Sequence, residues 1–123
     1  MAEKTIRPLD FVGSSRKDLK AMPDVVRRTF GTALFLAQGG EKAEQAKPLK
    51  GFRGAGVLEV IEDYDTDTYR AVYTVRFSEV VYVLHIFQKK SRAGIATSSR
   101  DLELVKTRLK KAEEMYAERN NNC

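Results

Sequence analysis

The segment from Tyr82 to Ser91, YVLHIFQKKS, restricts the fold more than any other part of the chain. Its first six residues are aromatic, aliphatic or β-branched with the exception of one histidine, and this composition favours a β-strand. Alternation divides these side chains between two faces, with Val83, His85 and Phe87 on one and Tyr82, Leu84 and Ile86 on the other. A strand that is apolar on both faces is usually central in its sheet. The sequence therefore predicts a central strand that ends in two lysines, Lys89 and Lys90.

The length and composition indicate a single folded domain. A chain of 123 residues buries roughly two-thirds of its unfolded surface, and 42% hydrophobic with 32% charged residues is typical of a globular protein. No apolar run reaches the length of a membrane span, and the N-terminal MAEKTIRPLDF lacks the hydrophobic segment of a signal peptide. Because the one cysteine, Cys123, is the last residue, an internal disulfide is excluded. We therefore expect a cytoplasmic protein without membrane contact.

Turn signals and hydrophobic periodicity predict seven elements in the order β-α-α-β-β-β-α. They are a strand within residues 7–13, a helix from Ser15 that ends before Pro23, a helix from Pro23 to Gly39, strands at about 57–64, 69–77 and 80–89, and a helix from about 98 or 99 to 118. The polar, glycine-rich residues 41–56 are expected to be a connection. This order is typical of an α+β domain, in which an antiparallel meander carries the helices on one face. Residues 1–119 would form the domain and residues 120–123 a disordered tail.

Two of the helices have apolar stripes that predict which side of each is buried. The stripe of the helix after Pro23 comprises Val26, Phe30, Ala33 and Ala37. The stripe of the last helix comprises Leu102, Val105, Leu109, Ala112 and Tyr116. We expect both stripes to contribute to the core.

Basic residues are grouped at three places along the predicted meander. The groups are Lys47, Lys50 and Arg53 before its first strand, Arg70 and Arg76 in its middle strand, and Lys89, Lys90 and Arg92 at the end of its last strand. Neighbouring strands would unite them as a concave positive surface on the face that the helices leave open, near Tyr69, Tyr82 or Phe87. Arg and Lys contact RNA phosphates, and aromatic rings stack on unpaired bases. Alternatively, cations at strand ends are simply solvated, and a net charge of +5 does not decide between the two.

Four segments together resemble a known protein family. They are KPLKGFRG from Lys47, TYRAVYTV from Thr68, VVYVLHIFQKKS from Val80 and GIATSSRDLELVKTRLKKA from Gly94. They are similar to the HigB-like toxins of bacterial toxin–antitoxin systems, in the phage-derived branch of the RelE superfamily. The resemblance covers roughly residues 49–112. It implies a small, basic α+β protein that binds in the ribosomal decoding site and cuts translated mRNA. Its partner would be a helix-turn-helix antitoxin (HigA-like), in a heterotetramer.

The resemblance also implies roles for individual residues. It gives Arg70, Lys89 and Lys90 as catalytic candidates and Lys50 and Arg53 as RNA-binding candidates. The basic groups along the meander add Lys47, Arg76 and Arg92 to the RNA-binding candidates. The strand arginine matches a group that stabilises the phosphate, and the lysine pair matches a basic pair that closes the last strand. The basic segment before the meander matches a loop that contacts RNA.

The chain departs from the family pattern in two places. Thr97-Ser98 precedes the last helix where this branch often has Thr-Pro. The Tyr or His near the C-terminus that serves some superfamily nucleases has no clear counterpart, because Tyr116 belongs to the apolar stripe. A general base is therefore not identified. A lysine made less basic by its neighbour in the Lys89–Lys90 pair is one candidate, and two ordinary solvated lysines are the alternative.

His85 and Arg70 each have a structural interpretation as an alternative to a role in catalysis. His85 is the only histidine and the obvious group to titrate near neutral pH. Its apolar strand neighbours favour instead a buried residue whose polar atoms are satisfied. Arg70 has the alternative of an ion pair with Asp67 or Glu59.

Metal and phosphate-loop motifs are incomplete. GFRGAG at 51–56 lacks the terminal Gly-Lys-Ser/Thr of a phosphate loop, so its glycines favour a turn. The acidic loop that begins at Asp63 lacks the glycine and the glutamate that complete a calcium loop. With one histidine and one terminal cysteine, a zinc site is not expected either. We therefore expect no metal and no cofactor.

The favoured interpretation is a cytoplasmic toxin that acts as a metal-independent, ribosome-dependent mRNA endonuclease, an mRNA interferase. One alternative is a non-catalytic RNA- or ribosome-binding module on the same scaffold. Another is a basic interaction subunit of a protein complex. Cleavage of transcripts would separate the first two, and salt-sensitive RNA binding would separate the last two.

Overall fold

The computed structural model describes residues 6–52, 54–90 and 96–121 of the chain. Its elements are β1 (Leu9–Phe11), α1 (Ser15–Lys20), α2 (Asp24–Gln38), β2 (Ala46–Pro48), β3 (Val57–Tyr64), β4 (Asp67–Thr74), β5 (Val81–Lys89) and α3 (Ser99–Asn121). The seven predicted elements are all present, and the α+β class is confirmed. The additional strand, β2, lies within the segment that was expected to be a connection.

The five strands form one sheet in the order β1-β5-β4-β3-β2. Strands β3, β4 and β5 are the predicted antiparallel meander, and β1 pairs with β5 in parallel. Strand β2 pairs antiparallel with β3 at the other edge, where a proline such as Pro48 is tolerated. Strands β4 and β5 thus lie inside the sheet, as the apolar character of β5 predicts.

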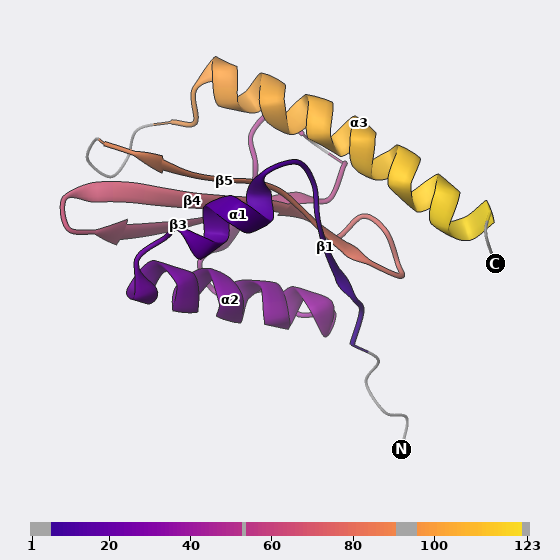
Figure 1. The fold of residues 1–123 in the computed structure, drawn as a ribbon, viewed down its shortest axis with the longest axis horizontal. Coiled ribbons are helices and arrows are strands. Elements are labelled where there is room, and N and C mark those ends of the chain that lie inside the picture. The colour runs from indigo at the N-terminus through magenta and orange to yellow at the C-terminus, as the bar shows by residue number, and fades with distance from the viewer. Residues whose placement is uncertain (1–5, 53, 91–95, 122–123) are drawn as a thin grey trace.

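The helices cover both faces of the sheet, and the expectation that they share one face is wrong. In Figure 1, α2 lies on one side of the sheet and α3 on the other. The side chains of β4 show why: Ala71 and Tyr73 pack in the core under α2, whereas Val72 packs in the core under α3. Because both faces of the central strands are apolar, a single layer of helices would leave one face in water.

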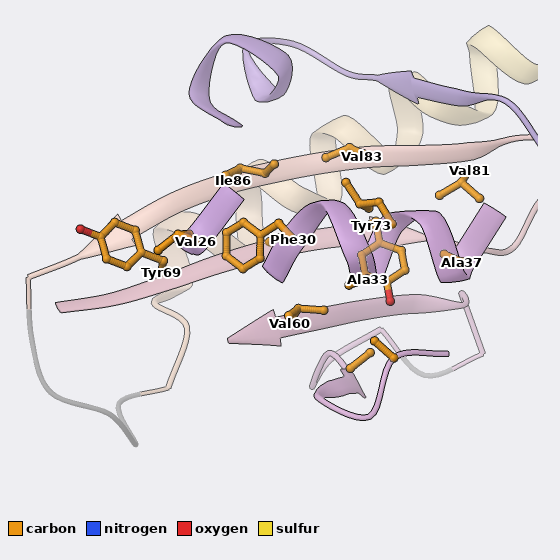
Figure 2. Close-up of a cluster of buried hydrophobic side chains, with 14 residues drawn as sticks. Val26, Phe30, Ala33, Ala37, Val60, Tyr69, Tyr73, Val81, Val83 and Ile86 are labelled. Carbon is orange, nitrogen blue, oxygen red and sulfur yellow. The ribbon is translucent and has the colours of Figure 1, made fainter. Parts of the chain in front are cut away.

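The core under α2 contains the predicted helical stripe (Figure 2). Its helical residues Val26, Phe30, Ala33 and Ala37 are all buried against the sheet. Tyr73 of β4 lies in the same cluster, and burial raises its pKa to about 12. Phe35, on the same helix, is 60% exposed because it belongs to the opposite side of α2.

The core under α3 contains the stripe predicted for the last helix. Val105 and Ala112 are fully buried, and the other three members are partly buried against the same cluster: Leu102, Leu109 and Tyr116. Arg108 of α3 adds a polar contact, because its Nη1 donates to the carbonyl of Leu84 at 3.0 Å. The helix is therefore attached to β5 by both apolar packing and a hydrogen bond.

A β-bulge in β5 changes which of its side chains face α3. The register between β4 and β5 shifts so that Val72 pairs with His85 while Tyr73 pairs with Val83. Leu84 is the additional residue, and both Leu84 and His85 contact the α3 side. Simple alternation grouped Val83 with His85 and is wrong here, because Val83 packs under α2.

Helix α1 begins at Ser15 and ends before Pro23 as predicted, whereas α3 extends beyond its predicted end. The hydroxyl that interacts with Asp18 at the start of α1 belongs to Ser14, at 2.7 Å, while Ser15 is buried and donates to the Val83 carbonyl at 3.1 Å. At the other end of the chain, α3 continues to Asn121, so part of the expected tail is helical, and residues 122–123 lie outside the described residues. No helix in the described part of the chain is long and apolar enough to cross a membrane.

Two phenylalanines on α2, one buried and one exposed, test the described packing of this helix on the sheet. Phe30 has no exposed surface, so Phe30→Ala should lower the free energy of unfolding by about 3–5 kcal/mol. Phe35→Ala is the matched control, because the same change at an exposed position should alter stability by less than about 0.5 kcal/mol. Urea denaturation of both variants measures the difference. Equal effects of the two changes would contradict the described position of α2.

Candidate nucleic-acid interface

A pocket of about 300 Å³ lies between β2, β3 and the residues that lead into α3. We call it the Arg70 pocket. Its polar lining comprises Lys47, Lys50, Glu59, Arg70 and Thr97, and its apolar lining includes Pro48, Leu49, Ile61 and Leu102. Three of the predicted site residues therefore meet at one hollow, on the α3 side of the sheet.

Arg70 is buried in this arrangement, with only 2% of its surface exposed. Its Nη1 donates to Glu59 Oε2 at 3.3 Å and to Thr97 Oγ1 at 3.0 Å, and Thr97 Oγ1 donates to the same Glu59 oxygen at 2.5 Å. The expectation that the guanidinium reaches an open face of the sheet is wrong. The alternative ion pair with Glu59 is observed, whereas Asp67 accepts a hydrogen bond from Gln88 at 2.6 Å.

Strand register explains why these side chains meet. Ile61 of β3 lies directly opposite Arg70 of β4, and Glu59 follows on the same face of β3. Diagonal neighbours on one face of an antiparallel pair are close enough for long side chains to touch. Lys47 of β2 lies opposite Glu59, so both residues line the Arg70 pocket.

A second group of polar residues surrounds Asp101 in the first turn of α3, and we call it the Asp101 cluster. Asp101 Oδ1 is 2.9 Å from His85 Nε2. Its Oδ2 is 3.6 Å from Lys89 Nζ and accepts a hydrogen bond from Ser98 Oγ at 2.7 Å. The imidazole also stacks on Phe87, with ring centroids 4.2 Å apart. Asp101 therefore joins two residues of β5 to the start of α3.

The pKa shifts in this cluster follow from burial and from the close partners. Burial lowers the pKa of His85 below its ordinary value of 6.5, and the hydrogen bond and charge of Asp101 oppose this without outweighing it. Burial alone would raise the pKa of Asp101, but hydrogen bonds from His85 and Ser98 and the charge of Lys89 hold it below 3.8. A neutral His85 therefore donates from Nε2 to an ionised carboxylate.

The expected burial of His85 is confirmed, but the expectation that its polar atoms are satisfied is wrong for Nδ1. Only 7% of the residue is exposed, and its Nδ1 is buried without a hydrogen-bond partner in the part of the chain that the structure describes. Nδ1 is therefore shielded from solvent in the described structure. The bulge that turns His85 toward α3 therefore serves the contact with Asp101.

The remaining predicted residues do not complete one continuous surface. Arg76 follows the far end of β4, where its Nη1 is 2.6 Å from Glu113 Oε2 of α3. Lys90 is exposed just after β5. Two further candidates, Arg53 and Arg92, lie outside the described residues. Of the aromatic rings expected nearby, Tyr69 and Tyr82 are buried, so they cannot stack on bases.

Comparison with known proteins identifies the family. The model of the phage-derived Gp49-like proteins (DUF891) matches residues 17–110, which is more than half of the chain. The chain belongs to the Gp49-like family. Its fold is similar to that of the toxin RelE of E. coli, solved as a double arginine mutant in the free state, with a TM-score of 0.54 and 21% sequence identity. The match covers 87% of this chain and 97% of that chain, whereas no curated protein matches.

The family match confirms the phage-derived part of the expected resemblance, and the structural match confirms the RelE-like fold. No group of three or more His, Cys, Asp or Glu side chains in the described ranges is placed to hold a metal ion.

Sequence reasoning missed the carboxylate at the centre of the second cluster. Ser98 and Asp101 have the three-residue spacing of a helix capping box, and the backbone N–H of Asp101 donates to Ser98 Oγ at 3.2 Å. That spacing was a usable signal for Asp101. Thr97 had no such signal, because its contact with Glu59 depends on how residues distant in sequence meet.

The ion pair of Arg70 predicts a large and specific loss of stability. Arg70→Ala should lower the free energy of unfolding by about 3–5 kcal/mol, because the Glu59 carboxylate would be left without its guanidinium partner in a largely buried place. Arg76→Ala is the matched control, since its pair with Glu113 is nearly half exposed and contributes about 0–1 kcal/mol. Chemical denaturation compares the two. If Arg70→Ala unfolds at the same denaturant concentration as the parent, the pair is not structural.

The single histidine allows a direct test of the Asp101 cluster by NMR. The imidazole should titrate with a midpoint below 6.5, and Asp101→Asn should move the midpoint lower still, because it removes the group that favours protonation. Since the folded pKa is below the unfolded one, the stability that neutral His85 contributes should be lost as pH falls below about 6.5. Asp24→Asn, on α2, should leave the midpoint unchanged. A midpoint that rises in Asp101→Asn would contradict the described contact.

Proposed function

We propose that this Gp49-like chain is the toxin of a type II toxin–antitoxin system, and that it acts in the cytoplasm as a ribosome-dependent mRNA endonuclease. The observation that supports this most is the Arg70 pocket, where Lys47, Lys50 and Arg70 meet on the side of the sheet that also carries Lys89. The RelE-like fold supports the same class, since the solved protein of that fold is described as a toxin.

The chemistry of RNA cleavage suits a site made of fixed cations. The ribose 2′-oxygen forms a bond to the adjacent phosphorus while the bond from phosphorus to the 5′-oxygen breaks. A proton leaves the 2′-hydroxyl, and another reaches the departing 5′-oxygen. Cations held in place stabilise the charge that builds up on the phosphate, which is often the largest contribution to catalysis. Orientation of the mRNA by the ribosome would supply much of the remainder.

The described contacts suggest different phosphate-binding roles for the candidate residues. Lys89 is held beside Asp101 with 17% of its side chain exposed, so its ammonium has a defined position close to the surface. Lys90 is exposed next to it, and Lys47 and Lys50 are exposed at the rim of the pocket. We propose that Lys89 and Lys90 stabilise the reacting phosphate and that the two rim lysines hold the flanking phosphates.

A helix-turn-helix antitoxin is the proposed partner, in a heterotetramer, and the family assignment supports a toxin–antitoxin pair. The net charge of +5 favours an antitoxin segment that is acidic where it contacts this chain. Binding over the exposed lysines would block the same cations that the RNA requires.

A second candidate, a non-catalytic RNA- or ribosome-binding module, is favoured by one observation. Arg70 and Lys89 are both paired with carboxylates, Glu59 and Asp101, which reduces the positive charge that they offer to a phosphate. Binding would still operate through the exposed lysines, because phosphate contacts do not require a reacting geometry.

Mapping of mRNA cuts in a translating extract tests the proposal. The parent protein should cut transcripts only when they are translated, and the triple variant Lys47→Ala, Lys50→Ala, Lys90→Ala should cut much less. The salt dependence of RNA binding should flatten by roughly 0.7 in log–log slope for each phosphate contact that is lost. These three lysines are exposed, so thermal melting should be close to that of the parent.

The matched control removes three other exposed lysines, Lys106, Lys110 and Lys111, from the outer side of α3. This variant has the same net charge as the first and should cut normally. Ribosome or RNA binding without any cleavage would favour the second candidate. Equal loss of binding in both triple variants would indicate a general effect of charge and would remove the Arg70 pocket from the proposal.

A further inference from the structure

Strand β1 forms one edge of the sheet, and in the described part of the chain only β5 pairs with it. The Pro8 carbonyl accepts a hydrogen bond from β5 at 3.0 Å, and the Val12 N–H donates one to β5 at 2.9 Å. Successive residues of a strand direct their backbone groups to opposite sides, so Leu9 and Phe11 direct theirs away from β5. A row of N–H and C=O groups at the edge of a sheet is a template for a further strand.

A pocket of about 610 Å³ lies along this edge and continues to α1, and we call it the edge groove. Its volume is within the range of ligand pockets. Its apolar lining comprises Leu9, Phe11 and Leu19, which pack only partly against the core under α2. Asp10 also lines the groove, but alternation places its side chain on the other face of β1, the face of Val12. The groove therefore offers apolar surface beside an unpaired strand edge.

The end of the edge groove next to α1 is basic. Arg16 and Lys20 line this end, and their i, i+4 spacing places both on the same side of the helix. Both are exposed, and neither forms an ion pair with any residue in the ranges that the structure describes. Asp18, the acidic residue of α1, interacts with Ser14 instead. Two cations without acidic partners at the end of an apolar groove favour a ligand that carries carboxylates there.

We propose that the edge groove binds an extended, acidic segment of a partner protein, which adds a strand to the sheet beside β1. The backbone groups of Leu9 and Phe11 pair with the main chain of the segment, and its apolar side chains enter the groove. Its carboxylates lie against Arg16 and Lys20. Because β1 is only three residues long, the main chain supplies few hydrogen bonds, and the side chains supply the selectivity. The inference rests on the proposed function, since it names the chemistry of the antitoxin segment that binds here.

The same observations favour a peptide over the two other occupants that a basic edge suggests. A strand edge matches the repeat of another peptide main chain, which RNA does not possess. A second copy would present its own β1, but residues 7–17 contain three basic side chains and one acidic one, so two such segments repel each other. An acidic segment from a different protein complements both the backbone edge and the charge.

The edge groove is also separate from the Arg70 pocket. Strands β1 and β2 are the two opposite edges of the sheet, and the Arg70 pocket lies at the β2 edge. A segment bound beside β1 therefore leaves Lys47 and Lys50 exposed. It would attach the partner protein, and another part of that protein would cover the lysines.

Binding of short peptides to the full chain tests the edge groove without requiring cleavage. The probes are the fluorescein-labelled peptides EEVTVTVEE, KKVTVTVKK and EESTSTSEE, measured by anisotropy at low salt. The first should bind at least about tenfold more tightly than the second, which has the wrong charge, and the third, which lacks apolar side chains. In NMR hydrogen exchange, EEVTVTVEE should slow exchange at the Leu9 and Phe11 amides and leave the amides of β2 unchanged.

Reversal of charge at the basic end should reverse the choice of peptide. The double variant Arg16→Glu, Lys20→Glu should bind KKVTVTVKK more tightly than EEVTVTVEE. The matched control is Lys106→Glu with Lys110→Glu, which makes the same change of charge at the same spacing on the outer side of α3. This control should keep the preference of the parent.

A second pair of variants tests the backbone edge. Leu9→Pro removes an N–H that does not bond to β5, so the sheet should remain while EEVTVTVEE binds at least about fivefold more weakly. Leu9→Ala shortens the same side chain but keeps the N–H, so it should bind more tightly than Leu9→Pro. Thermal melting of both variants checks that the fold persists, and the charge reversal does not depend on either of them.

Several results would overturn the inference. They are equal affinity for the three peptides, unchanged exchange at Leu9 and Phe11, and a preference for the acidic peptide that survives Arg16→Glu with Lys20→Glu. Sedimentation that shows dimers of the parent and monomers of Leu9→Pro would assign the edge to a second copy. Slowed exchange of the same amides by an oligouridine would assign it to RNA. Either assignment would also overturn the inference.

Mapped cuts in a translating extract keep this outcome separate from that of the proposed function. The variant Arg16→Glu, Lys20→Glu should cut like the parent, because the edge groove lies at the opposite edge from the Arg70 pocket. Cleavage by the parent together with equal affinity for the three peptides would exclude the edge groove and leave the endonuclease proposal standing. Selective binding of EEVTVTVEE without any cleavage would support the groove and overturn the endonuclease proposal.

Discussion

The burial of β4 and β5 on both faces is the constraint on which the rest of this structure depends. Each strand supplies apolar side chains to the core under α2 and to the core under α3, so neither helix is dispensable for covering the sheet. Burial on both sides also means that any polar side chain on these strands must find a partner inside the fold. Thr68 and Thr74 of β4 bond to Asp63 and to the Ala55 carbonyl. The buried guanidinium of Arg70 and the buried imidazole of His85 each reach a carboxylate, Glu59 for one and Asp101 for the other.

These partners link the stability of the fold to the electrostatics of the candidate site. Asp101 is part of the first turn of α3, so its contacts with His85 and Lys89 both position the helix and set the charge around the lysine. Glu59 likewise holds Arg70 while it lines a pocket. In each case a carboxylate that the fold requires also determines what the adjacent cation can bind. The candidate site therefore cannot be separated from the packing beneath it.

Much of the fold was predictable because hydrophobic spacing is a local property. The stripe that begins at Val26 and the one that begins at Leu102 are buried as expected, and β3 has the predicted ends. Strand β2 escaped prediction because its three residues include a lysine and a proline, and only its pairing with β3 makes it a strand. The face of Val83 was wrongly predicted because a bulge cannot be read from alternation.

The candidate site was less predictable, for a related physical reason. Lysines and arginines can be counted in a sequence, but their free charge depends on carboxylates that the fold brings to them. The expectation for Arg70 failed because Glu59 and Thr97 reach it from two other parts of the chain. The exposure of Lys47 and Lys50 was easier to predict, since cations close to an edge strand remain exposed whatever the packing of the core. The sequence could therefore indicate where an RNA strand would find positive charge, but not which cations the fold neutralises.

This difference between exposed and buried cations has a consequence for recognition. An exposed ammonium binds any phosphate, so it contributes affinity without distinguishing one base from another. A buried guanidinium already paired with a carboxylate is close to neutral as a unit, so it attracts phosphate weakly. The burial of Arg70 and its pair with Glu59 therefore make it a poorer phosphate ligand than an exposed arginine, and they leave the exposed Lys47 and Lys50 as the better placed cations of the Arg70 pocket.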